Sequence, residues 1–536
     1  EVADMTRTVE YETLMHMSDD DCWSIFCSHA FDWNENTPTN SRFEEIGKKI
    51  VKKCSGLPLA AMSLGGLLRS MEREEDWEFI LNKSWSFKDG TVDILSVIRM
   101  SYYDLPSHLK RCFAYCAIFP EDFVFEEDAL VLLWMAEGLI QSIQMGGEKK
   151  NMEDLGHDYF RDLVSRSFFL PSNRHGSQFP SPFRHESQYV IHDLVRDIAE
   201  EVASKTCCRV EKDADSPNHA IIERARHITF VRESLRTFDF LGKMQVIRSI
   251  LPLPLEDYGD TLLPQNTITA LLSKTRYLRV LSFHGYKISE LPEFIGSLKH
   301  LRYLDLSHTN IKSLPTSTTS LYNLHTLMLR RCWELKKLPR DIWKLINLYH
   351  LDITGAGLDE LPPGIAELKN LGRLSEFIVG KGRDAGLTSL KNLKLLRGEL
   401  RISKLENVTS AEDAKSAALR DKNKLEGLSL KWSEEPSNET THGGVLEELQ
   451  PHKDLKRLTI LGYRGASVPS WMVKLTLLRE IVINNCPMMS GSLPLAMTSL
   501  KRLHVYRCPL LVVKLPRSEL TALCISGCKE VDCVES

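Results

Sequence analysis

The segment Leu301-Arg302-Tyr303-Leu304-Asp305-Leu306 decides the fold of this chain, because its L-x-x-L-x-L spacing recurs at a nearly fixed step. The same pattern, with Phe or Ile in some copies, starts at Leu278, Leu324 and Leu348, which gives steps of 23, 23 and 24 residues. Each copy is followed by a Leu-Pro pair: Leu291-Pro292, Leu314-Pro315, Leu338-Pro339 and Leu361-Pro362. This period and pattern are typical of leucine-rich repeats, which stack into a solenoid with one strand per repeat on a concave face. The repeat pattern in the second half of the chain therefore predicts a surface for recognition of a partner rather than a catalytic domain.

The ladder of leucines continues toward the end of the chain with less regular steps. Further copies start at Leu425, Leu455, Leu478, Leu500 and Leu520. We expect a linker with irregular first repeats over residues 211–270, and leucine-rich repeats over 271–536 with a polar insert at about 433–444. Four cysteines stand three residues past the last apolar strand position of a repeat: Cys332, Cys486, Cys508 and Cys528. Small side chains turn inward at this position, so we expect these thiols to be packed. The last repeats lack a polar cap, which suggests a truncation or an early stop.

Composition and charge exclude several functional classes. A chain of 536 residues predicts two or more domains, and a net charge of −4 gives no reason to expect a polyanion partner. The longest strongly apolar run, residues 129–136, is far shorter than the roughly 20 residues that cross a bilayer. Thirteen cysteines without zinc-site spacing favour a reducing, cytoplasmic environment and no bound metal. We find no convergent Ser/His/Asp, Cys/His or paired-carboxylate pattern, so we expect no enzyme.

The first half predicts helices followed by a short sheet. Ser18–Asp21 is a capped helix start, and Pro58 is suited to the first position of another helix. Further helical patterns cover residues 42–53, 92–103, 108–119, 128–140 and 152–169. Tyr189–Ile191 is a short apolar strand, and Asp193 is expected to be the N-cap of a last helix over residues 194–203. With a polar wing or loop over residues 171–188, this order predicts a winged-helix unit over about 105–205.

Winged helices often bind DNA, but this one is expected not to. The helix best placed to enter a groove, Asn151 to Ser167, carries Glu153, Asp154, Asp158 and Asp162 against two arginines. Acidic side chains repel the phosphate backbone, so we expect no direct contact with nucleic acid.

Four motifs in a fixed order give the chain a family resemblance. They are Gly56-Leu57-Pro58-Leu59-Ala60, Cys112-Phe113-Ala114-Tyr115-Cys116-Ala117-Ile118-Phe119-Pro120, Leu133-Trp134-Met135-Ala136-Glu137-Gly138 and Ile191-His192-Asp193. Together with the repeats, they resemble the plant disease-resistance proteins of the nucleotide-binding leucine-rich-repeat class, especially its coiled-coil-containing branch. The resemblance covers essentially the whole chain. It implies a multidomain α plus α/β fold, with a helical ARC1 bundle and a winged-helix ARC2 subdomain ahead of the repeat solenoid.

The resemblance also implies domain bounds and a switching function. Residues 1–30 would be the tail end of a nucleotide-binding subdomain, 31–104 the ARC1 subdomain and 105–210 the ARC2 subdomain. Members of the class hold ADP at rest, exchange it for ATP when a pathogen effector or guarded host protein is sensed, and then self-assemble. In this chain, Pro58 and Leu59 would lie near the adenine and ribose. His192, with Asp193 beside it, would reach the β-phosphate of ADP, since an imidazole donates hydrogen bonds and carries charge near neutral pH. From the residues alone, the simpler interpretation is that Pro58 is a helix-start proline and His192 a structural turn residue.

One departure from the family limits these implications. The chain has no G-x-x-x-x-G-K-[ST] sequence, whose backbone and lysine hold the phosphates of bound nucleotides. The coiled coil and the phosphate-cradling subdomain would precede the part of the family that this chain resembles. We therefore expect weak or no binding of ADP or ATP by this chain alone. Either it is the ARC and repeat part of an immune receptor, or it is a repeat scaffold or decoy without nucleotide binding.

The repeats offer a candidate binding surface. Side chains between the strand leucines should point to the concave face, and one column of them is mostly basic. Its members are Arg279, Arg302, His325, Tyr349, Glu426, Lys456, Arg479 and Lys501. The column is either an ordinary solvated face or a stripe that binds an acidic surface on an effector, on a guarded host protein or on the acidic winged helix of the same chain. For partner binding we select Arg279, Arg302, Tyr349, Lys456, Arg479 and Lys501.

Overall fold

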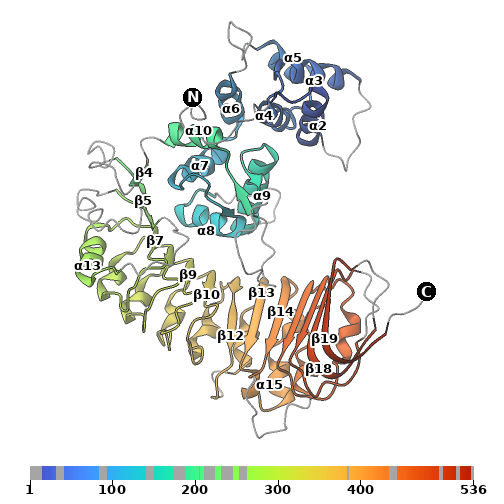
Figure 1. The fold of residues 1–536 in the computed structure, drawn as a ribbon. Helices are drawn as coiled ribbons and strands as arrows, with labels where there is room; N and C mark the ends of the chain where they lie inside the picture. The colour runs from blue at the N-terminus through green and yellow to red at the C-terminus, as the bar shows by residue number, and fades with distance from the viewer. Residues whose placement is uncertain are drawn as a thin grey trace, which may run out of the picture. The chain divides into compact units, whose positions relative to one another are not determined.

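The computed structural model divides the chain into two compact units, Glu1–Arg209 and Val210–Ser536 (Figure 1). It describes residues 15–31, 41–83, 93–140, 150–172, 188–203, 206–210, 224–230, 246–252, 262–382, 386–433, 444–493, 499–514 and 520–532. Most of the expected wing, of the linker and of the polar insert at 433–444 lies outside these residues. No helix among the described residues is long and apolar enough to cross a membrane.

The first unit begins with a helical bundle around one apolar core. Its helices are α2 (Asp19–Ala30), α3 (Ser41–Lys53), α4 (Pro58–Leu68), α5 (Glu74–Asn82) and α6 (Ile94–Asp104). Helix α2 starts as expected, because the Ser18 hydroxyl accepts a hydrogen bond from the Asp21 amide at 3.1 Å and three aspartates occupy the first turn. The buried Phe26, Ile50, Leu64 and Trp77 belong to one cluster. The expected boundary at residue 30 is therefore wrong, because α2 supplies part of the core of this bundle.

A winged-helix arrangement follows in the same unit. It comprises α7 (Ser107–Tyr115), η1 (Cys116–Ile118), β1 (Phe125–Glu126), α8 (Glu127–Glu137), α9 (Met152–Ser165), β2 (Leu170–Pro171), β3 (Gln188–Val190) and α10 (Asp193–Ala203). The three strands form an antiparallel sheet in the order β1-β3-β2. Aromatic rings fill the space beneath it, as in the edge-to-face contact of Phe125 with Phe169 at 5.3 Å between ring centroids. Strand β1 was not expected, because two residues are too short to show a period.

His157 of α9 connects the two central helices of this arrangement. Its Nδ1 atom lies 2.7 Å from Oε1 of Glu127 and its Nε2 atom 3.4 Å from Oδ1 of Asp128, both in the first turn of α8. Burial lowers the pKa of His157, but the hydrogen bond to Glu127 and the charges of Asp128, Glu127 and Glu153 outweigh it and raise the pKa above 6.5. The protonated form therefore stabilises the packing of α8 on α9.

We expect a pH-dependent stability from this contact. The contribution of His157 is fully present below pH 6.5 and is lost as the pH rises through the raised pKa of the folded protein. His157→Gln should therefore weaken the α8–α9 packing by on the order of 1 kcal/mol at acidic pH, and by less at alkaline pH. Hydrogen exchange of the α8 and α9 amides, compared between wild type and variant across pH 5 to 9, measures the difference. Glu127→Gln should reduce the same pH dependence, because Asp128 and Glu153 remain, and a difference between wild type and His157→Gln that stays constant with pH would contradict the assignment.

The second unit is built mainly from parallel strands of successive repeats. The first eight-stranded sheet has the order β11-β10-β9-β8-β7-β6-β5-β4. Its strands are β4 (Cys207–Val210), β5 (His227–Phe230), β6 (Ser249–Pro252), β7 (Val280–Ser282), β8 (Tyr303–Asp305), β9 (Thr326–Met328), β10 (His350–Asp352) and β11 (Arg373–Leu374). Leu281, Leu304, Leu327 and Leu351 are register partners on successive strands, which confirms the leucine ladder. The 3-10 helices η3 (Glu293–Ser297), η4 (Thr316–Ser320), η5 (Ile342–Lys344) and η6 (Pro363–Glu367) follow the four Leu-Pro pairs.

Strands β5 and β6 pair in the first sheet and lie within residues 211–270, the range in which a linker with irregular first repeats was expected. The helix α13 (Gln265–Lys274) is inserted between β6 and β7. This insertion lengthens the step between strands, and a search for a fixed period therefore misses the first repeats.

A second eight-stranded sheet carries the later repeats. It comprises β12 (Glu376–Ile378), β13 (Gly398–Ser403), β14 (Leu425–Lys431), β15 (Arg457–Leu461), β16 (Glu480–Asn484), β17 (Gly491–Ser492), β18 (Arg502–Lys514) and β19 (Ala522–Asp532). Short helices α14 (Thr388–Asn392), α15 (Ala411–Ser416), α16 (Val445–Glu448) and η10 (Ser470–Lys474) lie between its strands in the sequence, with η8 (Leu405–Asn407) and η9 (Leu419–Asp421). Cys332, Cys486 and Cys508 are fully buried, as expected, whereas Cys528 is only half-buried.

Ser375 links the two sheets. The Ser375 amide donates to the Leu351 carbonyl of β10 at 3.2 Å, while its own carbonyl accepts from the Arg401 amide of β13 at 3.1 Å. The Ser375 hydroxyl accepts from the Ile353 amide at 2.8 Å. The chain therefore changes from one set of strand neighbours to the next within a single residue.

Candidate functional site

The start of α4 carries Pro58 and Leu59 on a tight turn. Gly56 has a φ of 74°, and a Cβ atom there would lie 2.6 Å from the Met17 carbonyl oxygen, so this turn requires glycine. The Met17 amide donates to the Gly56 carbonyl at 3.1 Å, which ties the turn to the chain ahead of α2. Pro58 occupies the first helical position, and both Pro58 and Leu59 are half-buried. The glycine and the proline of this motif thus have structural roles of their own.

His192, not Asp193, is the N-cap of α10. The helix begins at Asp193, and the His192 carbonyl accepts from the Val195 and Arg196 amides at 2.8 and 2.9 Å. The His192 Nδ1 atom accepts from the Leu194 amide at 3.3 Å, which is the bond that an N-cap side chain makes. The expectation for Asp193 is therefore wrong by one residue. Asp193 is exposed in the first turn, where its charge favours the positive end of the helix.

This cap sets the hydrogen-bonding state of the imidazole. A neutral imidazole that accepts at Nδ1 carries its proton on Nε2, and His192 is exposed, so Nε2–H is a donor available at the surface. Within the described residues, no hydrogen bond or ion pair joins Pro58 or Leu59 to His192 or Asp193. The two pairs of residues that were predicted to contact a nucleotide are therefore not joined to each other among the described residues.

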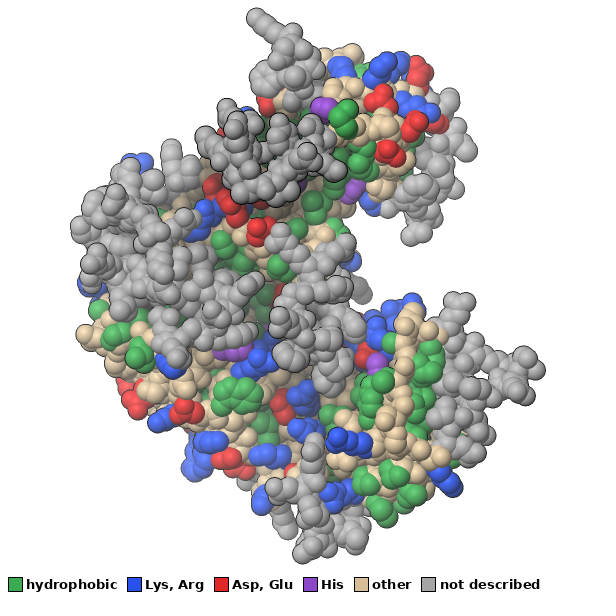
Figure 2. Space-filling view, in the orientation of Figure 1, with side chains coloured by type: hydrophobic (Ala, Val, Ile, Leu, Met, Phe, Trp, Pro, Cys, Tyr) green, Lys and Arg blue, Asp and Glu red, His purple; other side chains and the backbone are tan. Residues whose placement is uncertain are grey.

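The basic column forms two rows on the repeat strands, one in each sheet. The Arg302 amide donates to the Arg279 carbonyl, the His325 amide to the Arg302 carbonyl and the Tyr349 amide to the His325 carbonyl, each at 2.8 Å. In the second sheet, the Arg479 amide donates to Lys456 and the Lys501 amide to Arg479 in the same way. In the space-filling view, lysine and arginine side chains gather over the strands of the repeat unit (Figure 2).

The side chains of the column differ in how accessible they are to a binding partner. Lys456 Nζ lies 2.8 Å from Glu426 Oε1, so each charge compensates the other. The Tyr349 ring occupies the space of the next repeat, because a Cβ atom at Gly372 would lie 2.2 Å from its Cε2 atom. Arg479 and Lys501 are exposed, and no salt bridge involves either of them in the part of the chain that the structure describes. These two side chains are the most accessible charges of the column.

The column also extends beyond its expected beginning. The Arg279 amide donates to the Arg248 carbonyl and the Arg248 amide to the Arg226 carbonyl, each at 2.7 Å, so Arg226 and Arg248 precede Arg279 in the row. The pKa of His227 is lowered to about 3 by burial and by the charges of Arg248, Arg226 and Arg279. The first strands therefore carry a concentration of positive charge. The leucine period did not identify Arg226 and Arg248 as members of the column, because helix α13 interrupts it.

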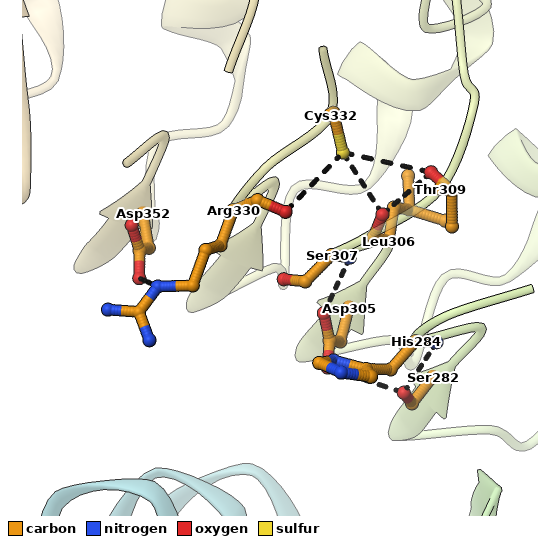
Figure 3. Close-up of polar contacts among 9 residues, drawn as sticks. All are labelled: Ser282, His284, Asp305, Leu306, Ser307, Thr309, Arg330, Cys332 and Asp352. Atoms are coloured by element: carbon orange, nitrogen blue, oxygen red, sulfur yellow. Dashed lines mark hydrogen bonds and ion pairs between the residues drawn. The ribbon is translucent and has the colours of Figure 1, made fainter. Parts of the chain in front are cut away.

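The carboxylates of Asp305 and Asp352, on strands next to the basic column, already have polar partners within the protein (Figure 3). Asp305 accepts from the Ser307 amide at 2.8 Å and lies 3.4 Å from His284 Nδ1 of the preceding repeat. Asp352 accepts from the Thr354 amide at 2.9 Å and lies 3.6 Å from Arg330 Nε. The same arrangement thus recurs two repeats apart. Burial alone would raise the pKa of Asp305, but the contacts with His284 and Ser307 hold it below its usual value.

A third carboxylate is buried under the second sheet's column. Glu480 is nearly inaccessible, and its Oε2 atom accepts from Arg502 Nε at 3.1 Å and from Nη2 at 2.8 Å. Because Glu480 is paired with Arg502, its carboxylate does not offset the positive charges of Arg479 and Lys501 on the strand surface.

The acidic side chains of α9 also have partners. Asp162 lies 3.0 Å from Arg166 Nε, Asp158 lies 3.2 Å from Arg161 Nη2, and Glu153 is buried. This helix therefore presents less free negative charge than its sequence suggests. Among the described residues, no group of three or more histidine, cysteine and acidic side chains is arranged to hold a metal ion.

These features define a class of protein: a helical and winged-helix unit joined to a leucine-rich-repeat recognition unit. Family models agree with this division. Residues 118–199 match the winged-helix domain of disease resistance proteins, residues 387–508 match the R13L1/DRL21 leucine-rich repeats, and residues 300–321 match the general leucine-rich-repeat model. The chain belongs to the disease resistance protein family of plants.

Individual relatives support this assignment. The chain is 42% identical over 469 residues to a disease resistance protein of Arabidopsis thaliana, with 85% of this chain and 32% of that protein covered. It is 38% identical to the RPP13-like protein 1 of Arabidopsis thaliana and 36% identical to the disease resistance protein RGA2 of Solanum bulbocastanum. Each of these matches covers 88% of this chain and 44% of the relative. The chain thus spans less than half the length of these relatives. Among solved structures, a leucine-rich-repeat protein of Leptospira interrogans is similar at a TM-score of 0.41 and 19% identity, over 59% of this chain and 76% of that protein.

Proposed function

We propose that this chain is the sensing and restraining part of a plant immune receptor. Its repeats recognise a pathogen effector or a guarded host protein, and in the whole receptor recognition promotes exchange of ADP for ATP and self-assembly in the cytoplasm. The observation that supports recognition is the two rows of basic side chains on successive strands, the second of which ends in the exposed Arg479 and Lys501. Names of the relatives support the immune role. The role of this chain is binding and switching, without catalysis of its own.

The geometry of His192 fits a contact with a nucleotide phosphate. Its Nδ1 atom is used in the cap of α10, and its Nε2–H is exposed and able to donate. The start of a helix also favours a negatively charged group, so the cap and the phosphate would reinforce each other. Pro58 and Leu59 would supply apolar contacts from the half-buried start of α4. A bound ADP would supply the negative charge that holds the resting state, and the P-loop part of a longer receptor would supply most of the affinity.

An external acidic partner fits the basic column better than the chain's own winged helix. The acidic residues Asp158 and Asp162 of α9 are engaged by Arg161 and Arg166, so little of their charge remains for an intramolecular contact. Since the sequence contains no P-loop, a second candidate function is a repeat scaffold or decoy that binds the same partner without a nucleotide. The two functions share the concave surface and differ in the role of His192.

Reversal of the two exposed charges tests the recognition surface. In the full-length receptor, Arg479→Glu combined with Lys501→Glu should lower the response to the recognised pathogen by at least about 10-fold, since like charges across an interface cost several kcal/mol in total. Ion leakage from leaves that express each variant, challenged with a pathogen isolate that the wild type stops, measures the response. Lys474→Glu, at an exposed position of η10, is the matched control. A double variant that responds like the wild type would rule out the column as the recognition surface.

A further inference from the structure

A groove lies on the helical side of the repeats, away from the strand positions of the basic column. It has a volume of about 950 Å³ and is lined by residues of two consecutive repeats, including η5 and η6. One wall carries Trp343 and Ile346, which are 44% and 58% exposed. Pro362 and Pro363 belong to the opposite repeat. Ligand sites in proteins typically measure about 300–1,000 Å³, so this groove can accept several side chains of a partner.

The shape of the groove depends on a glycine. A Cβ atom at Gly364 would lie 2.8 Å from Cδ1 of Trp343 and 3.1 Å from the Arg340 carbonyl oxygen. The indole therefore lies close against the backbone of the next repeat and leaves its outer part exposed. A half-covered tryptophan of this kind offers a rigid apolar contact to a partner, and tryptophan is enriched among the residues that dominate binding energy.

Apolar side chains continue from the groove along the edge of the repeats. The Asn347 side chain donates to the Tyr322 carbonyl at 2.7 Å, and the Asn370 side chain to the Ile346 carbonyl at 2.8 Å. These equivalent bonds place Tyr322 and Ile346 at matching positions of neighbouring repeats. Tyr322 is 47% exposed, and Lys299 Nζ lies 6.0 Å from the centre of its ring. Exposed apolar side chains that recur on neighbouring repeats are a feature of protein interaction surfaces.

The charges in the groove favour an acidic partner. Lys337, Arg340 and Lys369 line it, against the two carboxylates Glu360 and Glu367. Among the described residues, none of these five side chains forms a salt bridge, so the lining of the groove keeps an excess of one positive charge. Lys336 beside them is exposed as well and adds to the positive charge.

We propose that this groove binds a short acidic segment of another protein, with a bulky apolar side chain placed against Trp343 and Ile346 and carboxylates facing Lys337, Arg340 and Lys369. A hollow favours a peptide over a membrane, because the surface of a bilayer cannot fill a groove. The proposal is independent of the recognition role of the concave column, since it uses none of the same residues.

Binding of short synthetic peptides to the whole chain tests the proposal. Three labelled peptides are compared by fluorescence anisotropy: an acidic peptide with one central tryptophan, the same peptide with lysines in place of the acids, and the acidic peptide with alanine in place of tryptophan. The first should bind at least about 10-fold more tightly than the other two, and its affinity should fall as salt is raised. Equal affinities for the three peptides would overturn the proposal.

Variants locate the binding in the groove. Ile346→Glu and Trp343→Ala should each weaken binding of the acidic peptide by about 10-fold or more. Both side chains are about half exposed, at 44% for Trp343 and 58% for Ile346, so we expect the fold to tolerate the changes. Trp333→Ala is the matched control, because Trp333 is 64% exposed and does not line the groove. Affinity that survives both groove variants would overturn the proposal. So would vesicles with anionic lipids that bind in an Ile346-dependent way while the peptides do not, since the surface would then be a membrane contact.

Discussion

Leu304→Ala is expected to lower the free energy of unfolding of the repeat unit by roughly 3 kcal/mol. Leu304 is completely buried, and its register partners on the neighbouring strands are Leu281 and Leu327. Truncation of a buried leucine to alanine costs about 2–5 kcal/mol, because apolar contacts are lost and a cavity remains. In a solenoid each repeat is stabilised mainly by its neighbours, so the loss should extend to the adjacent repeats.

Urea unfolding followed by circular dichroism measures this change, and hydrogen exchange locates it. Leu477→Ala is the matched control, since the same side chain is 47% exposed there and its removal should cost less than about 1 kcal/mol. Equal losses for the two variants would show that the leucine ladder is not the core of the unit. Increased exchange confined to β8 and its two neighbours would agree with the nearest-neighbour picture.

His192→Ala is expected to activate the full-length receptor without a pathogen. The variant removes the cap of α10, which is worth about 1 kcal/mol, and the proposed bond from Nε2–H to a phosphate. A hydrogen bond to a charged group contributes about 1.5–3 kcal/mol, which corresponds to a shift of roughly 10- to 150-fold from the resting toward the active state. Ion leakage from leaves that express the receptor alone measures the activation, and Asp193→Val should act in the same direction.

Two further variants separate the cap from the phosphate contact. Asparagine is an excellent N-cap, so His192→Asn keeps the cap of α10 and removes only the imidazole. Activation by His192→Asn would support the contact with a nucleotide, whereas a silent His192→Asn beside an active His192→Ala would assign the effect to the helix alone. Asp197→Ala, at an exposed position of the same helix, should remain silent. If His192→Ala and Asp193→Val are both silent, the switch assignment is wrong for this protein.

The parts of the fold that follow a local period could be predicted from the sequence. The leucine ladder at Leu281, Leu304 and Leu327 and the capped start at Ser18 were correct, because a strand leucine and an N-cap depend on a few neighbouring residues. The helical bundle agrees in outline with the expected one, although its identity as ARC1 stays a prediction.

The wrong predictions concern positions whose structure is determined by packing against residues far away in the sequence. Helix α2 belongs to the bundle because Phe26 packs in its core, which no local pattern reveals. The cap of α10 was assigned to Asp193 because aspartate is the better N-cap by preference, yet the backbone places the less usual His192 there. The pairing of Lys456 with Glu426 depends on the register of β14 and β15, whose step is too irregular for the sequence to align them.

Ser375 has a mechanical consequence. Within each sheet, successive strands are joined by ladders of hydrogen bonds along their length, which makes an arc of repeats stiff. The hydrogen bonds at the junction of the two sheets include those of Ser375 and one from the Arg397 amide to the Gly372 carbonyl at 2.8 Å. Because the strand neighbours change at this junction, we expect the solenoid to bend there more easily than within either sheet. A ligand that contacts both Arg302 in the first sheet and Lys501 in the second would restrict bending at this junction. The stiffness of the solenoid would then change when the ligand binds.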